Sequence, residues 1–265
     1  IAAFNNSGFD ILGGLQNLIP YRDNVLLNLT TCGLIICGGL GFLVMIDLYR
    51  ARSFHRLTLH SKVVLTTTGA LLLAGTLLLK ATEEMTWLGA FFHSVSARTA
   101  GFSTYPMGEL TNAGLFVLIL LMFIGASPGS TGGGIKTTTF FTLMQEVRTV
   151  FSKRRPEAFH RSLPVEVMSK AATITLLSIV VVCCGTFLLC ILEPERDFIQ
   201  LLFEMVSAFG TVGLSTGITP DLSVAGKLVL IFTMFIGRLG AFTLLSIWIN
   251  RPDSNIRYTE EMITI

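Results

Sequence analysis

The chain has 265 residues, of which 51% are apolar and only 14% are charged, and its mean hydropathy is +0.69. A soluble domain usually carries about a quarter charged residues, so the composition excludes an ordinary water-soluble domain and a disordered chain. The net charge of +2 is too small for a general nucleic-acid binder, and we expect no nucleic-acid partner. The composition therefore predicts a protein that lies in a lipid bilayer.

Apolar stretches of two lengths alternate along the chain. About 20 apolar residues cross the hydrocarbon core of a bilayer. Uninterrupted stretches of this length lie at about 25–48, 63–82, 171–192 and 224–249. A further stretch, at about 112–145, is interrupted at 125–136 by GASPGSTGGGIK. Shorter stretches, long enough only for re-entrant helices, lie at about 87–97 and 198–209.

Basic residues gather after the first span, after the interrupted span and in the C-terminal tail, and 12 of the 19 lie there. Cytoplasmic loops carry an excess of Lys and Arg, so we expect these segments and the C-terminus on the cytoplasmic side. The opposite loops carry nine acidic and four basic residues. This negative face is expected to attract cations, although ordinary solvated loop charges are the alternative.

Three glycine-containing tracts resemble one another, at 2–9 (AAFNNSGF), 95–102 (VSARTAGF) and 207–214 (SAFGTVGL). Each holds a four-residue core that we call a tetrad. The tetrads are Asn6-Ser7-Gly8-Phe9, Thr99-Ala100-Gly101-Phe102 and Thr211-Val212-Gly213-Leu214. Farther along, CGGLGF at 37–42 resembles IGRLGAF at 236–242. The chain therefore contains an internal repeat.

The tetrads lie where the backbone must leave helical geometry at membrane depth, which is tolerated only where protein shields it or where it lines a water-filled cavity. A re-entrant helix that ends in a glycine tract delivers successive carbonyl oxygens toward an axis. Such oxygens replace the hydration shell of a monovalent cation. The tetrads therefore predict a cation filter; the alternative is that their small residues only pack helices closely.

Three segments carry a family resemblance: SARTAGF at 96–102, GASPGSTGGGIKTTT at 125–139 and VSAFGTVGLSTG at 206–217. They resemble the Trk/Ktr/HKT superfamily of potassium transporters, most closely the KtrB membrane subunits of bacterial Ktr potassium uptake systems. The resemblance implies an all-α membrane protein built from repeated units. Each unit is an outer helix, a re-entrant pore helix with a filter loop, and an inner helix, and four units surround a pseudo-fourfold pore.

The resemblance also divides the chain into units. It implies the end of pore unit two, with its filter and inner helix, at 1–60; pore unit three, with a broken inner helix and a gating loop, at 61–161; pore unit four at 162–250; and a cytoplasmic C-terminal tail at 251–265. The sequence opens without an initiator methionine and without a signal peptide. We therefore expect a C-terminal fragment of a longer protein, with pore unit one outside it.

Two sets of site residues follow from the resemblance. It implies that K⁺ binds at the twelve tetrad residues, which would form the selectivity filter. The gating residues that it implies are Gly125, Ser127, Pro128, Gly129, Ser130, Thr131, Gly132, Gly133, Gly134, Lys136 and Arg238. Proline and glycine resist regular helix, so a mobile plug is physically sensible, and a permanently packed helix break is the alternative. A phosphate-binding loop is disfavoured because the tract follows an apolar helix and not a strand.

Arg238 lies in the middle of an apolar span, where a cation costs at least about 2.5–3.5 kcal/mol. We therefore expect it to face the pore or a carboxylate, for which Glu204 is the candidate. The resemblance places the matching arginine below the filter, as a barrier that acts with the gating loop. Lys136 either adds to this barrier or reaches the cytoplasmic surface. Arg98, before the second tetrad, is expected to brace the pore helix.

The four histidines are isolated, and the sequence shows no nucleophile with a base, no paired carboxylates and no redox motif, so we expect neither an enzyme nor a cofactor. The resemblance implies the ion-translocating subunit of a bacterial potassium uptake system, which moves K⁺, with Na⁺ as a second candidate ion, down its electrochemical gradient. It further implies a homodimer in the cell inner (plasma) membrane on a KtrA-like ring of cytosolic nucleotide-binding subunits. The alternatives are a Trk-type or other cation transporter of the superfamily, a non-conducting assembly protein, and a proton-coupled carrier of an organic solute.

Overall fold

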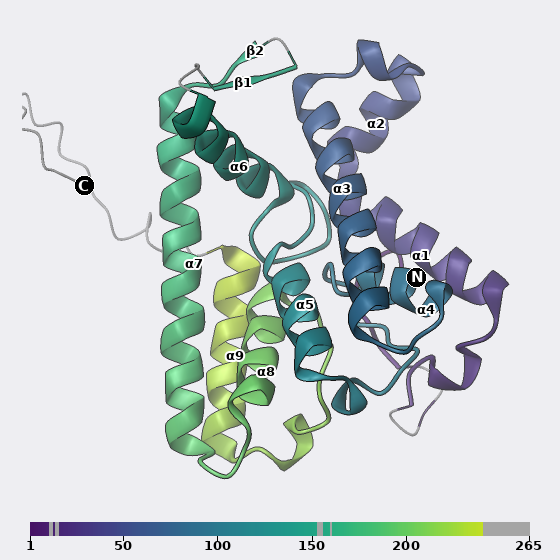
Figure 1. Cartoon of the computed structure of the whole chain (residues 1–265), viewed down its shortest axis with the longest axis vertical. Coiled ribbons are helices and arrows are strands. Elements are labelled where there is room, and N and C mark those ends of the chain that lie inside the picture. Colours follow the sequence, from purple (N-terminus) through teal and green to yellow (C-terminus); the bar gives the residue numbers. More distant parts are fainter. Residues whose placement is uncertain (11–12, 14–15, 153–155, 160, 241–265) are drawn as a thin grey trace, which may run out of the picture.

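The computed structural model describes residues 1–10, 13, 16–152, 156–159 and 161–240, and its elements are mainly helices (Figure 1). The α-helices are α1 Val25–Leu40, α2 Phe42–Ala51, α3 Leu59–Thr82, α4 Trp87–Ser96, α5 Asn112–Phe123, α6 Thr137–Ser152, α7 Val165–Leu192, α8 Phe198–Gly210 and α9 Val224–Leu239. Two short strands, β1 Glu157–Ala158 and β2 Arg161–Ser162, pair antiparallel. Single 3-10 turns lie at Ile19–Tyr21, Phe54–Arg56, Met107–Glu109 and Thr219–Asp221. The predicted all-α fold is confirmed.

Two predicted spans are found as single helices, α3 and α7, and each is long and apolar enough to cross a membrane. The interrupted stretch is also found, since α5 ends at Phe123 and α6 begins at Thr137. The predicted span at 25–48 is found as two helices, α1 and α2, which are together long and apolar enough to cross a membrane but meet at an angle of 99°. The predicted span at 224–249 is described only in part: α9 ends at Leu239, and residues 241–249 lie outside the described part of the chain.

Gly41 produces the bend between α1 and α2. Its φ of +88° is unfavourable for residues with a Cβ, and a Cβ there would lie 2.6 Å from the carbonyl oxygen of Pro128. The backbone N–H of Phe42, at the start of α2, donates to the carbonyl of Gly129 at 3.3 Å. The bend therefore depends on a segment almost 90 residues away in sequence. Gly240 has a similar φ of +86° at the end of α9.

The helices form two groups with the same internal order. In one group α3 packs against α4 and α5, and in the other α7 packs against α8 and α9. Contact between α5 and α8 joins the groups, and α1 and α2 flank the first of them (Figure 1). The largest buried apolar cluster includes Leu118, Met122, Phe203, Met205 and Phe209 and lies where α5 meets α8. The repeat seen in sequence thus corresponds to a repeat in packing.

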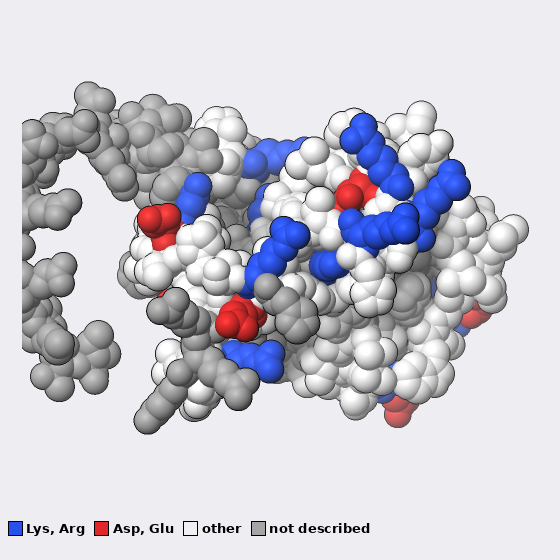
Figure 2. Space-filling model, turned by 90° about the horizontal axis from the view of Figure 1, so that it is seen from above, with Lys and Arg blue, Asp and Glu red and all other residues white. Residues whose placement is uncertain are grey.

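Charges of opposite sign lie at opposite ends of α3 and α7. Figure 2 shows Lys and Arg side chains gathered on the end of the molecule where α2 meets α3 and where β1 and β2 lie. The residues at that end include Arg50, Arg52, Arg56, Lys62 and Arg161. The far ends of α3 and α7 lead into loops that carry Glu83 and Glu84, and Glu193 and Glu195. Both long helices therefore run from a basic end to an acidic end.

The two groups share a connection between the outer helix and the inner helix. Glu83, which follows α3, accepts hydrogen bonds from the backbone N–H of Thr111 at 3.0 Å and from its hydroxyl at 2.6 Å. Glu193, which follows α7, accepts one from the backbone N–H of Ser223 at 2.7 Å. Thr111 and Ser223 are the N-caps of α5 and α9. Each carboxylate thus satisfies an otherwise free N–H group at a helix start.

Replacement of Glu193 by glutamine tests this connection through its pH dependence. The hydroxyl and the backbone N–H of Ser223 hold the pKa of the Glu193 carboxyl below its ordinary value. The stabilisation is therefore present above the pKa of an unfolded glutamate, about 4.3, and is lost as the pH falls through the lowered folded value. We expect the wild-type protein to have a higher Tm than the variant at pH 7, and the difference to vanish once the pH lies below the lowered pKa of Glu193.

The measurement is thermal unfolding of the purified protein in detergent across this pH range. Glu195→Gln serves as the control, because Glu195 is an exposed acid two residues along the same loop. A difference in Tm between wild type and Glu193→Gln that grows on acidification contradicts the assignment.

Candidate functional site

The three tetrads, far apart in sequence, lie side by side. A Cβ built on Gly8 would lie 2.5 Å from the carbonyl oxygen of Ala100, and one built on Gly101 would overlap the carbonyl oxygen of Val212. One built on Gly213 would lie 3.7 Å from the Cα of Gly101. The third residue of each tetrad therefore approaches the backbone of a neighbouring tetrad, so the three segments surround a common space.

The tetrads share an unusual backbone. Their first residues have positive φ angles, which are 50° at Asn6, 78° at Thr99 and 50° at Thr211. Their third residues, all glycine, also have positive φ angles, between 61° and 94°. Positive φ is uncommon for residues other than glycine, so its recurrence in three segments is a property of the site. A backbone that alternates the sign of φ turns successive carbonyl oxygens toward one side, as a carbonyl-lined filter requires.

A serine at the end of each pore helix holds the tetrad that follows it. The hydroxyl of Ser96 in α4 donates to the carbonyl of Phe102 at 2.5 Å, and that of Ser207 in α8 donates to the carbonyl of Leu214 at 2.6 Å. Both serines are buried, and their acceptors are the fourth residues of the second and third tetrads. The predicted re-entrant helices thus anchor the predicted filter loops through equivalent side chains.

A second polar side chain lies three residues before each serine. His93 in α4 is buried, and its Nε2 lies 3.5 Å from the hydroxyl of Thr104. Glu204 in α8 holds the corresponding place in the other unit and is 4% exposed. His93 was expected to be isolated, but alignment of the two units on their serines pairs it with Glu204.

Glu204 binds the loop after the third tetrad. Its Oε1 accepts from the hydroxyl of Ser215 at 2.7 Å, the backbone N–H of Thr216 at 2.9 Å and the hydroxyl of Thr216 at 3.2 Å, and its Oε2 accepts from the hydroxyl of Thr219 at 2.7 Å. The alternative in which Arg238 pairs with Glu204 is therefore wrong. The carboxylate is saturated by donors of its own unit, on the opposite side of the tetrad from Arg238.

Alanine at position 204 is expected to destabilise the protein far more than glutamine. Alanine leaves the buried N–H of Thr216 without an acceptor, and an unsatisfied buried donor costs about 1–3 kcal/mol. Glutamine retains a carbonyl oxygen for that donor, and the Thr219 hydroxyl can rotate to accept from the amide. Thermal unfolding in detergent measures the difference, with Glu109→Ala as a control at an exposed acid. Equal Tm values for Glu204→Ala and Glu204→Gln contradict this account.

The interrupted segment between α5 and α6, residues 124–136, lies against the first residues of the tetrads. We call it the 124–136 loop. A Cβ on Gly132 would overlap the hydroxyl of Thr99, and one on Gly133 would overlap that of Thr211. The side-chain amide of Asn6 donates to the same Thr99 hydroxyl at 3.4 Å. The loop therefore covers one end of the space that the tetrads surround.

Hydrogen bonds hold the 124–136 loop in this place. Ile124 pairs with Ile135, so the two ends of the loop lie together. The backbone N–H of Ser127 donates to the carbonyl of Gly39 at 3.1 Å, and the hydroxyl of Thr131 to that of Gly38 at 3.4 Å. Within the loop, the hydroxyl of Ser130 donates to the Ser127 carbonyl at 2.6 Å. The loop is thus fixed to the bend between α1 and α2.

Two cations also donate to carbonyl oxygens of the loop. Arg238 at the end of α9 donates to the carbonyl of Thr131, and the Nζ of Lys136 donates to that of Gly132 at 2.6 Å. The two side chains are close enough to repel each other. Lys136 is partly buried, and its ammonium group contacts the loop. Positive charge gathers at the end of the site that the loop covers.

A cavity lies at the other end of the tetrads. Its volume is about 560 Å³, and its lining includes Gly8, Gly101 and Gly213 together with Asp10 and Thr216. The side-chain amide of Asn17, also in the lining, donates to the carbonyl of Gly101 at 3.3 Å. The tetrads therefore separate an open vestibule from a space closed by the 124–136 loop. Among the described residues, no group of three His, Cys, Asp or Glu side chains could hold a metal ion.

Comparison with known proteins adds three findings. The family model described as TrkH, cation transport protein, matches residues 62–256. The chain is 38% identical over its full length to the potassium/sodium uptake protein NtpJ of Enterococcus hirae, and covers 62% of that protein. It is 37% identical over 98% of its length to the Ktr system potassium uptake protein B of Bacillus subtilis, and covers 61% of that protein.

A solved structure has a fold similar to that of this chain. The potassium transporter TrkH from Vibrio parahaemolyticus superposes with a TM-score of 0.76 at 21% identity, over 93% of this chain and 56% of that one. At this identity the likeness concerns the fold alone. The chain spans about three fifths of the length of the curated relatives that it matches.

Proposed function

The chain belongs to the TrkH family of cation transport proteins, and on that premise we propose that it forms part of the ion path of a potassium uptake system. One observation carries the proposal: three tetrads with glycine at positive φ converge between an open vestibule and a closing loop. Carbonyl oxygens in such an arrangement replace the hydration shell of K⁺. The names of the two relatives, which take up potassium or potassium and sodium, support K⁺ as the cargo with Na⁺ as a competitor.

Transport in this proposal needs no chemical step in the chain. One elementary charge that crosses a potential of 100 mV gains about 2.3 kcal/mol, which is enough to concentrate K⁺ roughly fiftyfold. The tetrad residues select the ion. The 124–136 loop, with Lys136 and Arg238, gates the path, because positive charge at the base of the filter opposes a cation until the loop moves.

The proposal extends to orientation and assembly. The basic end of α3 and α7 faces the cytoplasm and the acidic vestibule end faces outward, according to the excess of Lys and Arg in cytoplasmic loops. Units two, three and four of the pore occupy residues 1–60, 61–161 and 162–250, and 251–265 form a cytoplasmic tail. The protein acts as a homodimer on a ring of nucleotide-binding subunits, which fits the Ktr system named for one relative. The basic segments about 50–62 and 146–161 would contact that ring.

Complementation of a bacterium that lacks its potassium uptake systems tests the proposed function. Cells that carry the full-length gene should grow at low external K⁺, and they should accumulate ⁸⁶Rb⁺ when the membrane is energised. Collapse of the membrane potential with an uncoupler should stop accumulation. An expressed, membrane-inserted protein that restores neither growth nor uptake would favour a non-conducting assembly protein.

A further inference from the structure

Arg98, the residue before the second tetrad, is a buried cation without a carboxylate partner among the described residues. Arg98 is 7% exposed. The salt bridges found in the described part of the chain join other residues, Arg22 to Asp23 and Arg196 to Asp221. The hydrogen bond that it makes runs from Nη2 to the carbonyl of Gly125 at 3.3 Å. Arg98 was expected to brace the pore helix, and its acceptor lies in the 124–136 loop, so the side chain joins the segment after α4 to that loop.

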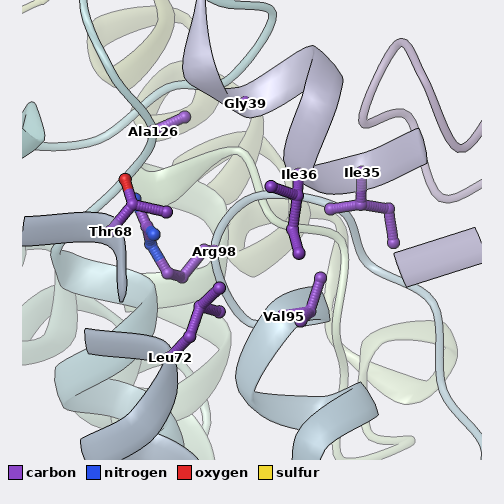
Figure 3. Close-up of a pocket in the computed structure, with 8 residues that line it drawn as sticks. All are labelled: Ile35, Ile36, Gly39, Thr68, Leu72, Val95, Arg98 and Ala126. Carbon is purple, nitrogen blue, oxygen red and sulfur yellow. The ribbon is translucent and has the colours of Figure 1, made fainter. Parts of the chain in front are cut away.

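The surroundings of Arg98 leave the loop as its main polar neighbour. Figure 3 shows the side chain in a pocket that is lined mainly by apolar groups such as Leu72, Val95 and Ala126, with Thr68 also in the lining. The cavity measures about 20 Å³, which is room for roughly one water molecule and not for a larger ligand. The Nε atom of Arg98 lacks a protein partner. A buried cation is costly, so its retention points to a role that the Gly125 contact fulfils.

The carbonyl of Gly125, which accepts from Arg98, lies where the two ends of the 124–136 loop meet. Gly125 follows the end of α5 by two residues, where helix carbonyls lack intrahelical partners and the helix dipole favours a cation. It also packs against the far end of the loop, because a Cβ on Gly125 would overlap the carbonyl oxygen of Gly133. One hydrogen bond to this carbonyl therefore restrains both ends of the loop.

Among the three tetrads, an arginine precedes only the second, and the unit of that tetrad also contains the 124–136 loop. The residue before the tetrad is Asn5 in the first, Arg98 in the second and Gly210 in the third. The inner helix interrupted by the long glycine-rich segment is the one that follows the second tetrad. Thr99, next to Arg98, contacts the same loop at Gly132. The Arg98–Thr99 pair thus joins filter and loop in the unit that contains the loop.

We propose that Arg98 is a positioning residue that couples the second tetrad to the 124–136 loop and holds the loop in its closing position. The inference rests on the proposed function, because it assigns the loop as the gate. Lys136 and Arg238 donate to carbonyls later in the loop, and Arg98 secures its beginning. Loss of the Gly125 contact releases the loop and raises ion flux.

Arg98→Met and Arg98→Lys test the coupling in reconstituted protein. Methionine fills the apolar pocket without a donor, whereas lysine keeps the charge and a donor. The first readout is the reactivity of a Ser130→Cys reporter with a maleimide, against the same protein without that cysteine. The second is ⁸⁶Rb⁺ flux in proteoliposomes per folded molecule. With Met we expect about a tenfold rise in both, the change that corresponds to about 1.4 kcal/mol, and with Lys values closer to wild type.

Lys80→Met is the matched control. The Nζ of Lys80 also donates to a backbone carbonyl, that of Met85 at 2.7 Å, but it does so at the acidic end of α3, far from the loop. This variant should change neither reporter reactivity nor flux. A rise in reactivity with Lys80→Met equal to that with Arg98→Met would overturn the inference, because it would show general loosening of the protein.

A double variant separates coupling from a general effect on the filter. In protein that lacks residues 126–133, Arg98→Met should leave flux at the value of the deletion alone, because Arg98 acts through the loop. An additive rise, or wild-type reporter reactivity in Arg98→Met, overturns the proposal. If Arg98→Met does not fold, Arg98→Gln takes its place. Wild-type protein that carries no Rb⁺ refutes the proposed function, while the maleimide reaction still decides whether Arg98 holds the loop.

Discussion

Serine in place of Gly101 is expected to remove potassium-selective uptake. Gly101 has a φ of +79°, a conformation that costs a residue with a Cβ about 1–2 kcal/mol. A Cβ there would also overlap the backbone oxygen of Val212, which no side-chain rotation can relieve. The neighbouring tetrads must therefore shift, and their carbonyl oxygens with them. We expect the preference for K⁺ over Na⁺ to fall about tenfold or more, measured as ⁸⁶Rb⁺ uptake in the presence of competing Na⁺.

Two other glycines separate backbone strain from steric overlap. Gly213 has a φ of +94°, but a Cβ on it would lie 3.7 Å from its nearest neighbour, so Gly213→Ser is expected to impair selectivity less than Gly101→Ser. Gly217 has a φ of +96° and open space around it, outside the tetrads, so Gly217→Ser should keep the selectivity of the wild type. Wild-type affinity and selectivity in Gly101→Ser would refute the assignment of the filter.

Removal of residues 126–133 is expected to raise ion flux. The deletion joins Gly125 to Gly134, and the gap is small, because a Cβ on Gly134 would lie 3.3 Å from the Cα of Gly125. It removes the contacts of Gly132 with Thr99 and of Gly133 with Thr211, and it frees Arg238 from the loop. We expect flux per folded molecule to rise about tenfold, equal to a barrier lower by about 1.4 kcal/mol.

The deletion also decides between a gate and a fixed helix break. Flux is measured as ⁸⁶Rb⁺ entry into proteoliposomes and is divided by the amount of monodisperse protein from size-exclusion chromatography. A gate gives higher flux from folded protein. A loop that only supports the bend at Gly41 gives less folded protein and no gain in flux, because the loop packs against that bend at Pro128.

Hydropathy and glycine spacing were enough to locate most of the architecture. The stretches at 63–82 and 171–192 became α3 and α7, and the interruption at 125–136 became a loop between two helices. These features are local, because a span needs only a run of apolar residues and a helix break needs only proline and glycine in sequence. The three tetrads were also found from sequence. Each needs positive φ angles at its first and third residues, and similar residues recur at these positions.

The partners of the charged side chains could not be predicted in this way. Glu204 was the candidate partner of Arg238 in the salt-bridge alternative, but it binds the loop that follows its own tetrad, while Arg238 donates to a carbonyl of the 124–136 loop. Arg98 was expected to brace the pore helix, and the carbonyl that accepts from it, that of Gly125, lies in the 124–136 loop. In both arginine contacts the acceptor is a backbone carbonyl. Because every residue carries a backbone carbonyl, the sequence does not indicate which carbonyl accepts from which arginine.

The sequence by itself thus determined that this protein lies in a membrane, where its helices break and where its three glycine-containing tetrads lie. Tertiary structure decided the 99° bend at Gly41, the closure of the tetrads by the 124–136 loop, and the cations that hold this loop. The physical reason is the range of the interactions. Hydropathy and backbone freedom act within about 20 residues, whereas each of these features depends on contacts between segments brought together only by packing.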